Sequence, residues 1–97
     1  MAKGYWIVMY RRINDPEKLE AYRKLAGPVM QASGGRPLVR GDPAKTYEAG
    51  LNQRVVAIEF DSIEQAIAVH DSPGYQAALK ALGDGAERDV RFVEGMA

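Results

Sequence analysis

The sequence predicts an α+β fold in which strands and helices follow one another in the order β-α-β-β-α-β. Two apolar runs, YWIVMY at residues 5–10 and RVVAIEF at residues 54–60, are rich in the β-branched and aromatic residues of buried strands. Each run is followed by a helix-capping residue and by apolar residues at helical spacing. With 97 residues, the chain is expected to form a single domain over residues 1–97.

The first helix is expected to begin at Asp15-Pro16, directly after the first strand. Aspartate caps unpaired backbone N–H groups, and proline suits the first helical position because its missing donor would have no partner there. Residues at helical spacing form an apolar stripe that ends before Gly34-Gly35: Leu19, Tyr22, Ala26, Val29, Met30 and Ser33. Pro28 falls within this pattern, so we expect it to kink or shorten the helix.

Two strands are expected in the middle of the chain. Residues 38–40 (LVR) form a short strand before a turn at residues 41–43 (GDP), and residues 45–49 (KTYEA) are expected to continue it as an edge segment. A loop at residues 50–53 then leads into the apolar strand at residues 54–60.

The second helical region has two parts. Ser62 and Gln65 match a capping box, and an apolar face follows at helical spacing: Ile63, Ala66, Ile67 and His70. Ser72-Pro73 is expected to end this helix and begin another, with Tyr75, Ala78, Leu79 and Leu82 on its buried face. Residues 83–85 (GDG) end the helical region, and residues 89–93 (DVRFV) form the last strand.

This order of elements is that of the ferredoxin-like fold, a four-stranded antiparallel sheet with two helices on one face. The third strand, however, is apolar on both sides: Val56, Ile58 and Phe60 lie on one face, and Val55, Ala57 and Glu59 on the other. The helices cover only one face, and monomers avoid large exposed apolar patches. We therefore expect a homodimer that forms through the uncovered sheet faces.

The composition argues against several kinds of partner. Lys plus Arg and Asp plus Glu each total 13, so the basic excess typical of a nucleic-acid-binding module is missing. The chain has no cysteine for disulfides or thiolate metal ligands, and no apolar stretch of the ~20 residues that a membrane span requires. We expect a soluble, cytoplasmic protein without metal or cofactor, and without nucleic-acid or membrane partners.

Several short motifs resemble one known family. They are AKGYW, NDPE, GGRPLVRG, VVAIEFDSIEQA, SPGYQ and VEG. Together they are similar to the bacterial domain-of-unknown-function family 1330, within the dimeric α+β-barrel superfamily. The resemblance implies a ferredoxin-like protomer, a two-fold dimer with facing sheets and no established reaction. The chain departs from the family pattern at Val69 and His70, where tryptophan and tyrosine are usual, and at Gly74, where glutamate is usual.

His70 is the candidate catalytic residue. It is the only histidine, and its position on the apolar face of its helix directs it toward the space between helices and sheet. An imidazole there suits acid–base chemistry or ligand binding, while the simpler interpretation is a hydrogen-bonded core residue. Tyr75 is a candidate ligand-binding residue beside it. Ser72 is not expected to be a nucleophile, because its surroundings lack the G-x-S-x-G pattern.

Arg40 and Glu59 form a second candidate pair, because each places a charge within an apolar strand. The simpler interpretation is an ion pair or a contact in the dimer interface. The alternative is that Arg40 offers a bidentate fork to a carboxylate or enolate ligand. Tyr5, Trp6, Tyr10 and Tyr22 are expected in the core, and Arg11, Arg12, Arg23 and Lys24 on a solvated surface.

Three functions remain open. The first is a homodimer that binds a small apolar or carboxylated molecule between helices and sheet. The second is a cofactor-independent monooxygenase or isomerase, as suggested by analogy of fold alone. The third is a structural or regulatory dimer without a cavity. A cavity lined by His70, Tyr75 and aromatic residues of the first strand would favour a ligand or an enzyme.

Overall fold

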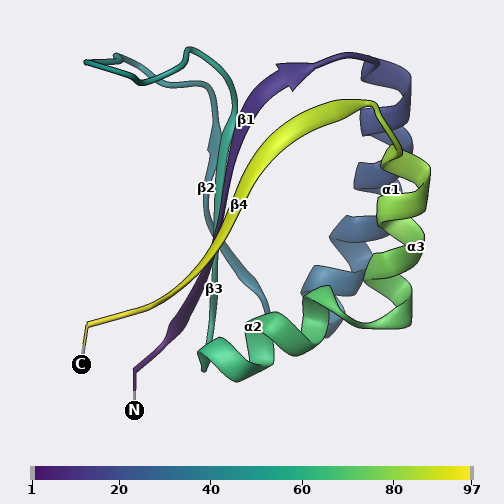
Figure 1. The fold of residues 1–97 in the computed structure, drawn as a ribbon. Coiled ribbons are helices and arrows are strands. Elements are labelled where there is room, and N and C mark those ends of the chain that lie inside the picture. The colour runs from purple at the N-terminus through teal and green to yellow at the C-terminus, as the bar shows by residue number, and fades with distance from the viewer. Residues whose placement is uncertain (1, 97) are drawn as a thin grey trace.

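The computed structural model describes residues 2–96 and contains the predicted order of elements (Figure 1). The second helical region is divided in two, as expected at Ser72-Pro73. In chain order the elements are β1 (Gly4–Ile13), α1 (Pro16–Ala32), β2 (Arg36–Gly41), β3 (Val55–Phe60), α2 (Ile63–His70), α3 (Pro73–Leu82) and β4 (Ala86–Glu94).

The strands form one antiparallel sheet in the order β2-β3-β1-β4, with the helices on one face (Figure 1). The central strand β1 pairs with β3 from Gly4 opposite Phe60 to Met9 opposite Val55. On its other side it pairs with β4 along most of its length. The predicted ferredoxin-like topology is confirmed, and within the protomer the sheet is open rather than closed into a barrel.

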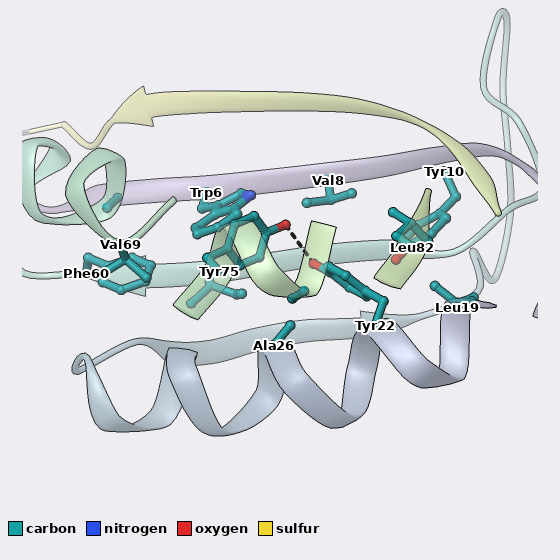
Figure 2. Packing of buried hydrophobic residues seen from close by; sticks show 13 residues of the cluster. Trp6, Val8, Tyr10, Leu19, Tyr22, Ala26, Phe60, Val69, Tyr75 and Leu82 are labelled. Carbon is teal, nitrogen blue, oxygen red and sulfur yellow. Dashed lines mark hydrogen bonds between the residues drawn. The ribbon is translucent and has the colours of Figure 1, made fainter. Parts of the chain in front are cut away.

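The hydrophobic core lies between the helices and the inner face of the sheet (Figure 2). Alternate residues of β1 and β3 point into it, as the pleat of a strand requires. The buried residues are Trp6, Val8, Tyr10, Leu19, Tyr22, Ala26, Ile58, Phe60, Ala66, Val69, Tyr75, Ala78 and Leu82. The intervening strand residues, such as Ile7 and its partner Ala57, face the uncovered side of the sheet.

Helix α1 begins as predicted, because the Asp15 carboxylate accepts hydrogen bonds from the backbone N–H groups of Glu17 and Lys18, at 3.0 and 3.3 Å. The helix continues through Pro28 to Ala32, so the expectation that proline would shorten it was wrong. Proline removes one backbone donor in a helix. Pro28 lies on an exposed part of α1, where water can hydrate the carbonyl group that loses its partner.

The expected edge strand at residues 45–49 was also wrong. In its place the chain turns, with the N–H of Gly50 donating to the carbonyl of Tyr47 at 2.9 Å and Glu48 at a φ of 52°. A turn of this kind cannot continue a strand ladder. The loop that contains it extends away from the sheet on the side opposite the helices (Figure 1).

Helix α2 has the predicted cap but a different buried face. The Ser62 hydroxyl accepts from the N–H of Gln65 at 3.1 Å, and the Gln65 side chain reaches back to the N–H of Asp61 at 3.1 Å. Ala66 and Val69 are buried, whereas Ile67 is exposed, so its predicted place on the buried face was wrong. Helix α2 has only eight residues, about two turns. Two residues three positions apart, Ala66 and Val69, are therefore enough to form its buried face.

Candidate functional site

A cavity of about 250 Å³ lies between α1 and the inner face of the sheet. Trp6, Val8 and Ile58 of the sheet form part of its apolar floor, and Ala26 and Met30 of α1 line the helix side. Cavities of this kind, apolar with a few polar groups, are typical binding sites for small molecules.

The rim of this cavity is strongly cationic. Five basic side chains from four different parts of the chain line it: Arg23, Lys24, Arg40, Arg54 and Arg88. Glu20 is the single carboxylate among the lining residues, and Arg23 contacts it at 3.5 Å. Because the chain as a whole has zero formal net charge, this is a local concentration of positive charge. An anionic group at the rim would be attracted to it.

Arg40 reaches the cavity because β2 contains a bulge. Pro37 pairs with Ile58, but Val39 pairs with the next residue of β3, Ala57, so β2 has one extra residue between these pairs. Without the extra residue, strict alternation would place Arg40 on the outer face. With it, Arg40 pairs with Val56 and lies on the inner face, at the cavity.

Two tyrosine hydroxyls and Arg88 form a polar cluster beside the cavity. The hydroxyls of Tyr22 and Tyr75 lie 2.7 Å apart, and the Arg88 guanidinium donates to the Tyr22 hydroxyl at 3.1 Å (Figure 2 shows the tyrosine contact). The Arg88 guanidinium also lies over the rings of Tyr22 and Tyr10, 4.8 and 5.8 Å from their centroids. Burial raises the pKa of Tyr22 well above its ordinary value, so this hydroxyl is neutral at physiological pH.

The structure places the predicted site residues in three different surroundings. Arg40 lines the cavity. Tyr75 is buried behind the cavity, where it contacts two lining residues: its hydroxyl bonds to Tyr22, and its ring packs against Trp6 at 4.8 Å between centroids. His70 does not line the cavity: its ring contacts Trp6, Tyr75 and Phe92, and its Nδ1 lies 3.0 Å from the Asp71 carboxylate. The predicted catalytic role of His70 stays a prediction.

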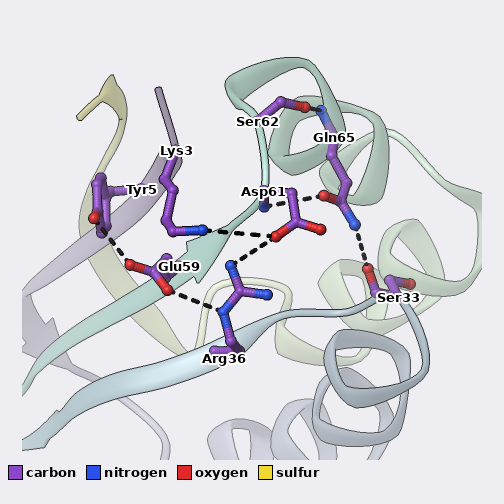
Figure 3. A network of polar contacts seen from close by, with 8 residues as sticks. All are labelled: Lys3, Tyr5, Ser33, Arg36, Glu59, Asp61, Ser62 and Gln65. Carbon is purple, nitrogen blue, oxygen red and sulfur yellow. Dashed lines mark hydrogen bonds and ion pairs between the residues drawn. The ribbon is translucent and has the colours of Figure 1, made fainter. Parts of the chain in front are cut away.

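Glu59 lies on the opposite face of the sheet from Arg40, so the expected pairing of these two residues was wrong. Glu59 accepts hydrogen bonds from Arg36 and from the Tyr5 hydroxyl, both at 2.9 Å (Figure 3). Arg36 also donates to Asp61 at 3.0 Å. The hydrogen bonds from Arg36 and Tyr5 hold the pKa of Glu59 below its ordinary value. This network joins β1, β2 and β3 at one end of the sheet.

Sequence reasoning missed most of the cationic rim. Arg23 and Lys24 were assigned to a solvated surface, and Arg54 and Arg88 were not singled out. Arg88 could have been found, because it alternates with the inward-facing Val90 in β4. Arg54 could likewise have been found, because it alternates with the inward-facing residues of the predicted strand at residues 54–60. Arg23 and Lys24 depend on the packing of α1 against the sheet, for which the sequence offers no local signal.

Neither a membrane helix nor a metal site is evident in the part of the chain that the structure describes. No helix within residues 2–96 is long and apolar enough to cross a bilayer. The same residues contain no group of three His, Asp or Glu side chains arranged to hold a metal ion.

Solved structures of other proteins share this fold at low sequence identity. A protein of unknown function from Rhodopseudomonas palustris, RPA0582, is 15% identical, with a TM-score of 0.77 over 99% of this chain and 84% of that one. A dimeric ferredoxin-like protein of unknown function from Thermobifida fusca is 19% identical, with a TM-score of 0.65 over 96% and 91%. A putative antibiotic biosynthesis monooxygenase from Nitrosomonas europaea is 15% identical, with a TM-score of 0.63 over 97% and 90%.

These likenesses define the class as small α+β proteins of the ferredoxin-like fold, some of which are described as dimeric. The chain belongs to the family called domain of unknown function DUF1330, whose model matches residues 3–96. The resemblance found in the sequence motifs is thereby confirmed. A search of curated proteins finds no match.

Proposed function

We propose that this protein binds a small amphiphilic carboxylic acid in the cavity between α1 and the sheet. The main support is the arrangement of an apolar floor below a rim with five cationic side chains and one carboxylate. An apolar ligand body would displace water from the partly exposed Met30 and Val56, while its carboxylate would lie at the rim. The position of this cavity supports the prediction, made from the sequence, that a small molecule binds between the helices and the sheet.

The chemistry of the rim favours a carboxylate. Guanidinium groups present paired donors that match the two oxygens of a carboxylate, and Arg40, Arg54 and Arg88 come from three different strands or strand ends. Within residues 2–96, Lys24, Arg40 and Arg54 have no carboxylate partner in an ion pair. The volume corresponds to about eight water molecules, which limits the ligand to a small one.

A homodimer through the outer sheet faces would leave this cavity open. The outer face has exposed apolar residues on three strands, namely Met9, Val39 and Val93. The cavity lies on the other face of the same sheet, beneath α1. Dimeric proteins among the structural neighbours support the assembly, and the apolar outer face supports this choice of surface. A bacterial, cytoplasmic protein remains our expectation, and the absence of cysteine is compatible with it.

The proposal is tested by calorimetric titration with 4-phenylbutyrate, a small acid with an apolar body. We expect binding by the native protein that weakens as salt concentration rises, because Arg23, Lys24 and Arg40 of the rim are exposed to solvent. Arg40→Gln should reduce the affinity by at least about tenfold, because a hydrogen bond to a charged group contributes about 1.5–3 kcal/mol. Arg12→Gln is the matched control, because Arg12 is an exposed β1 arginine outside the cavity whose partner is Glu87.

Two results would contradict the proposal. One is that the native protein does not bind the acid at millimolar concentration. The other is that Arg40→Gln and Arg12→Gln have the same affinity as the native protein. The enzyme alternative, a monooxygenase or isomerase, stays a prediction that rests on fold analogy.

A further inference from the structure

Two arginines and a tyrosine form one row across the inner face of the sheet. Tyr10 of β1 pairs with Arg88 of β4, and the Tyr10 backbone N–H donates to the carbonyl of Arg54 at 2.9 Å. All three residues line the cavity. The guanidinium groups of Arg54 and Arg88 lie over the Tyr10 ring, 5.9 and 5.8 Å from its centroid. Two cations are therefore placed beside one aromatic ring at the cavity.

These two guanidinium groups repel each other without a carboxylate of the protein to offset the repulsion. Neighbouring strands lie about 5 Å apart, so the Cα atoms of Arg54 and Arg88, one on each side of β1, are separated by about 10 Å. Both residues are half-buried, and salt screens such charges less than exposed ones. Within residues 2–96 neither arginine forms an ion pair with a carboxylate.

The partners that Arg88 does have are neutral. Its guanidinium donates to the Tyr22 hydroxyl at 3.1 Å and lies over the rings of Tyr22 and Tyr10. Burial raises the pKa of Tyr22, so this hydroxyl does not supply a negative charge at physiological pH. A guanidinium group has five N–H donors, and a half-buried one that lacks a carboxylate favours an anion from outside the chain.

Arg40 forms a separate cationic position. It lies on the edge strand β2 and pairs with Val56, two residues beyond Arg54 in β3. Two residues of a strand span about 7 Å, so Arg40 is displaced from the row of Tyr10 both along and across the sheet. A carboxylate neutralises one positive charge. One that binds Arg40 would therefore leave the two arginines at Tyr10 uncompensated.

We infer that the ligand is a dicarboxylic acid, with one carboxylate at Arg40 and the second between Arg54 and Arg88. This inference rests on the proposed function and specifies the ligand class for the same cavity. The cavity is lined by five cationic side chains and one carboxylate, so two negative charges match its local charge better than one. The apolar body of the ligand lies against Met30 and Val56, as for a monoacid.

The test compares benzylsuccinate with 3-methyl-4-phenylbutyrate by calorimetric titration. The two acids share one skeleton and differ in the group on a single carbon, a carboxylate in the first and a methyl group in the second. At about pH 8 both carboxyl groups of benzylsuccinate are ionised. We expect the native protein to bind benzylsuccinate at least about tenfold more tightly, as a second hydrogen-bonded charge allows. Its affinity should also fall more steeply as salt concentration rises.

Arg54→Gln keeps a polar side chain and removes one of the two cations at Tyr10. The preference for benzylsuccinate over the methyl acid should fall at least about fivefold, because one of the groups that bind the second carboxylate is gone. Arg12→Gln is the control and should keep the native preference, because Arg12 is outside the cavity. If Arg54→Gln does not fold, the comparison of the two acids in the native protein decides alone.

Two results would overturn this inference and leave the proposed function standing, provided that 4-phenylbutyrate binds. One is that the native protein binds benzylsuccinate no more tightly than the methyl acid. The other is that Arg54→Gln keeps the full native preference. If 4-phenylbutyrate, the methyl acid and benzylsuccinate all fail to bind, the proposed function itself is overturned.

Discussion

At the scale of single residues, His70 is packed against aromatic side chains and does not line the cavity. Its ring contacts three aromatic side chains, and its only side-chain hydrogen-bond partner among residues 2–96 is the neighbouring Asp71. The Asp71 carboxylate is largely exposed, so water can replace the imidazole as its partner. Loss of the imidazole nitrogens would therefore leave no buried group unpaired.

We predict that His70→Phe changes the free energy of unfolding by less than about 1 kcal/mol, because phenylalanine fills similar space against the same rings. The affinity for 4-phenylbutyrate should stay at the native value, since His70 does not line the cavity. Urea unfolding and calorimetric titration measure the two quantities. A large loss of affinity in a stable variant would restore His70 as a functional residue.

Glu59 makes stability depend on acid pH. Its folded-state pKa lies below the ordinary value of 4.5, chiefly through the hydrogen bond from Arg36. A lowered carboxyl pKa stabilises the folded state above the unfolded pKa, and this contribution is lost as pH falls through the folded pKa. We predict that the free energy of unfolding falls less steeply below about pH 5 in Glu59→Gln than in the native protein.

Urea unfolding at pH 6 and pH 3 measures this difference. Glu64→Gln is the control, because Glu64 has no ion-pair partner within residues 2–96 and lies in the first turn of α2. If Glu59→Gln and the native protein lose stability in parallel, the network at Arg36 has no effect on acid unfolding.

At the scale of elements, one serine separates α2 from α3. The Ser72 hydroxyl donates to the carbonyl of Val69 at 2.7 Å and accepts from the N–H of Tyr75 at 3.4 Å. It therefore ends one helix and begins the next. The change of direction allows α2 to contact β1 and α3 to contact α1.

We predict that Ser72→Ala lowers the free energy of unfolding by about 1 kcal/mol through loss of this cap. Ligand affinity should not change, because Ser72 is outside the cavity. Ser72→Thr, which retains a hydroxyl, should remain close to the native stability. Thermal melts of the two variants, measured beside the native protein, provide the comparison. Equal melting temperatures for the alanine and threonine variants would exclude a capping role.

The elements themselves were largely predictable, because their signals are local. Caps at Asp15, Ser62 and Ser72 mark helix starts, and alternation of apolar residues marks the inner faces of β1 and β3. The failures have physical causes beyond local sequence. The turn at Glu48 and the exposure of Ile67 follow from how neighbouring segments pack.

The candidate site was less predictable than the fold. Arg40 was identified as a ligand-binding candidate, but its inward direction depends on a bulge that no sequence pattern announced. The sequence predicted the wrong partner for Glu59, which pairs with Arg36. The sequence of a strand shows which of its residues share a face, but it does not show which residues of the neighbouring strand lie opposite them.

At the scale of the whole molecule, the two faces of the sheet have different roles. The inner face and α1 line the cavity, whereas no element within residues 2–96 covers the outer face (Figure 1). Ala57 lies near the middle of that outer face, opposite Ile7 of β1 and Val39 of β2. A charge at this position would be buried without a partner in a dimer formed through these faces.

We predict that Ala57→Lys converts a dimer into a monomer or unfolds the protein. Ala77→Lys, on an exposed position of α3, should leave the dimer intact. Sedimentation velocity at low micromolar concentration distinguishes the species, and circular dichroism reports whether the variant is folded. A native protein that sediments as a stable monomer would contradict the proposed assembly.

The pairing of β1 with β4 also has a consequence during protein synthesis. The strand made first forms its longest ladder with the strand made last, from Gly4 opposite Glu94 to Ile13 opposite Ala86. A nascent chain that still lacks β4 therefore has one edge of its central, most apolar strand unpaired. Such edges are prone to join other chains. Translation that pauses before residue 86 would prolong the interval in which the growing polypeptide requires protection by a chaperone.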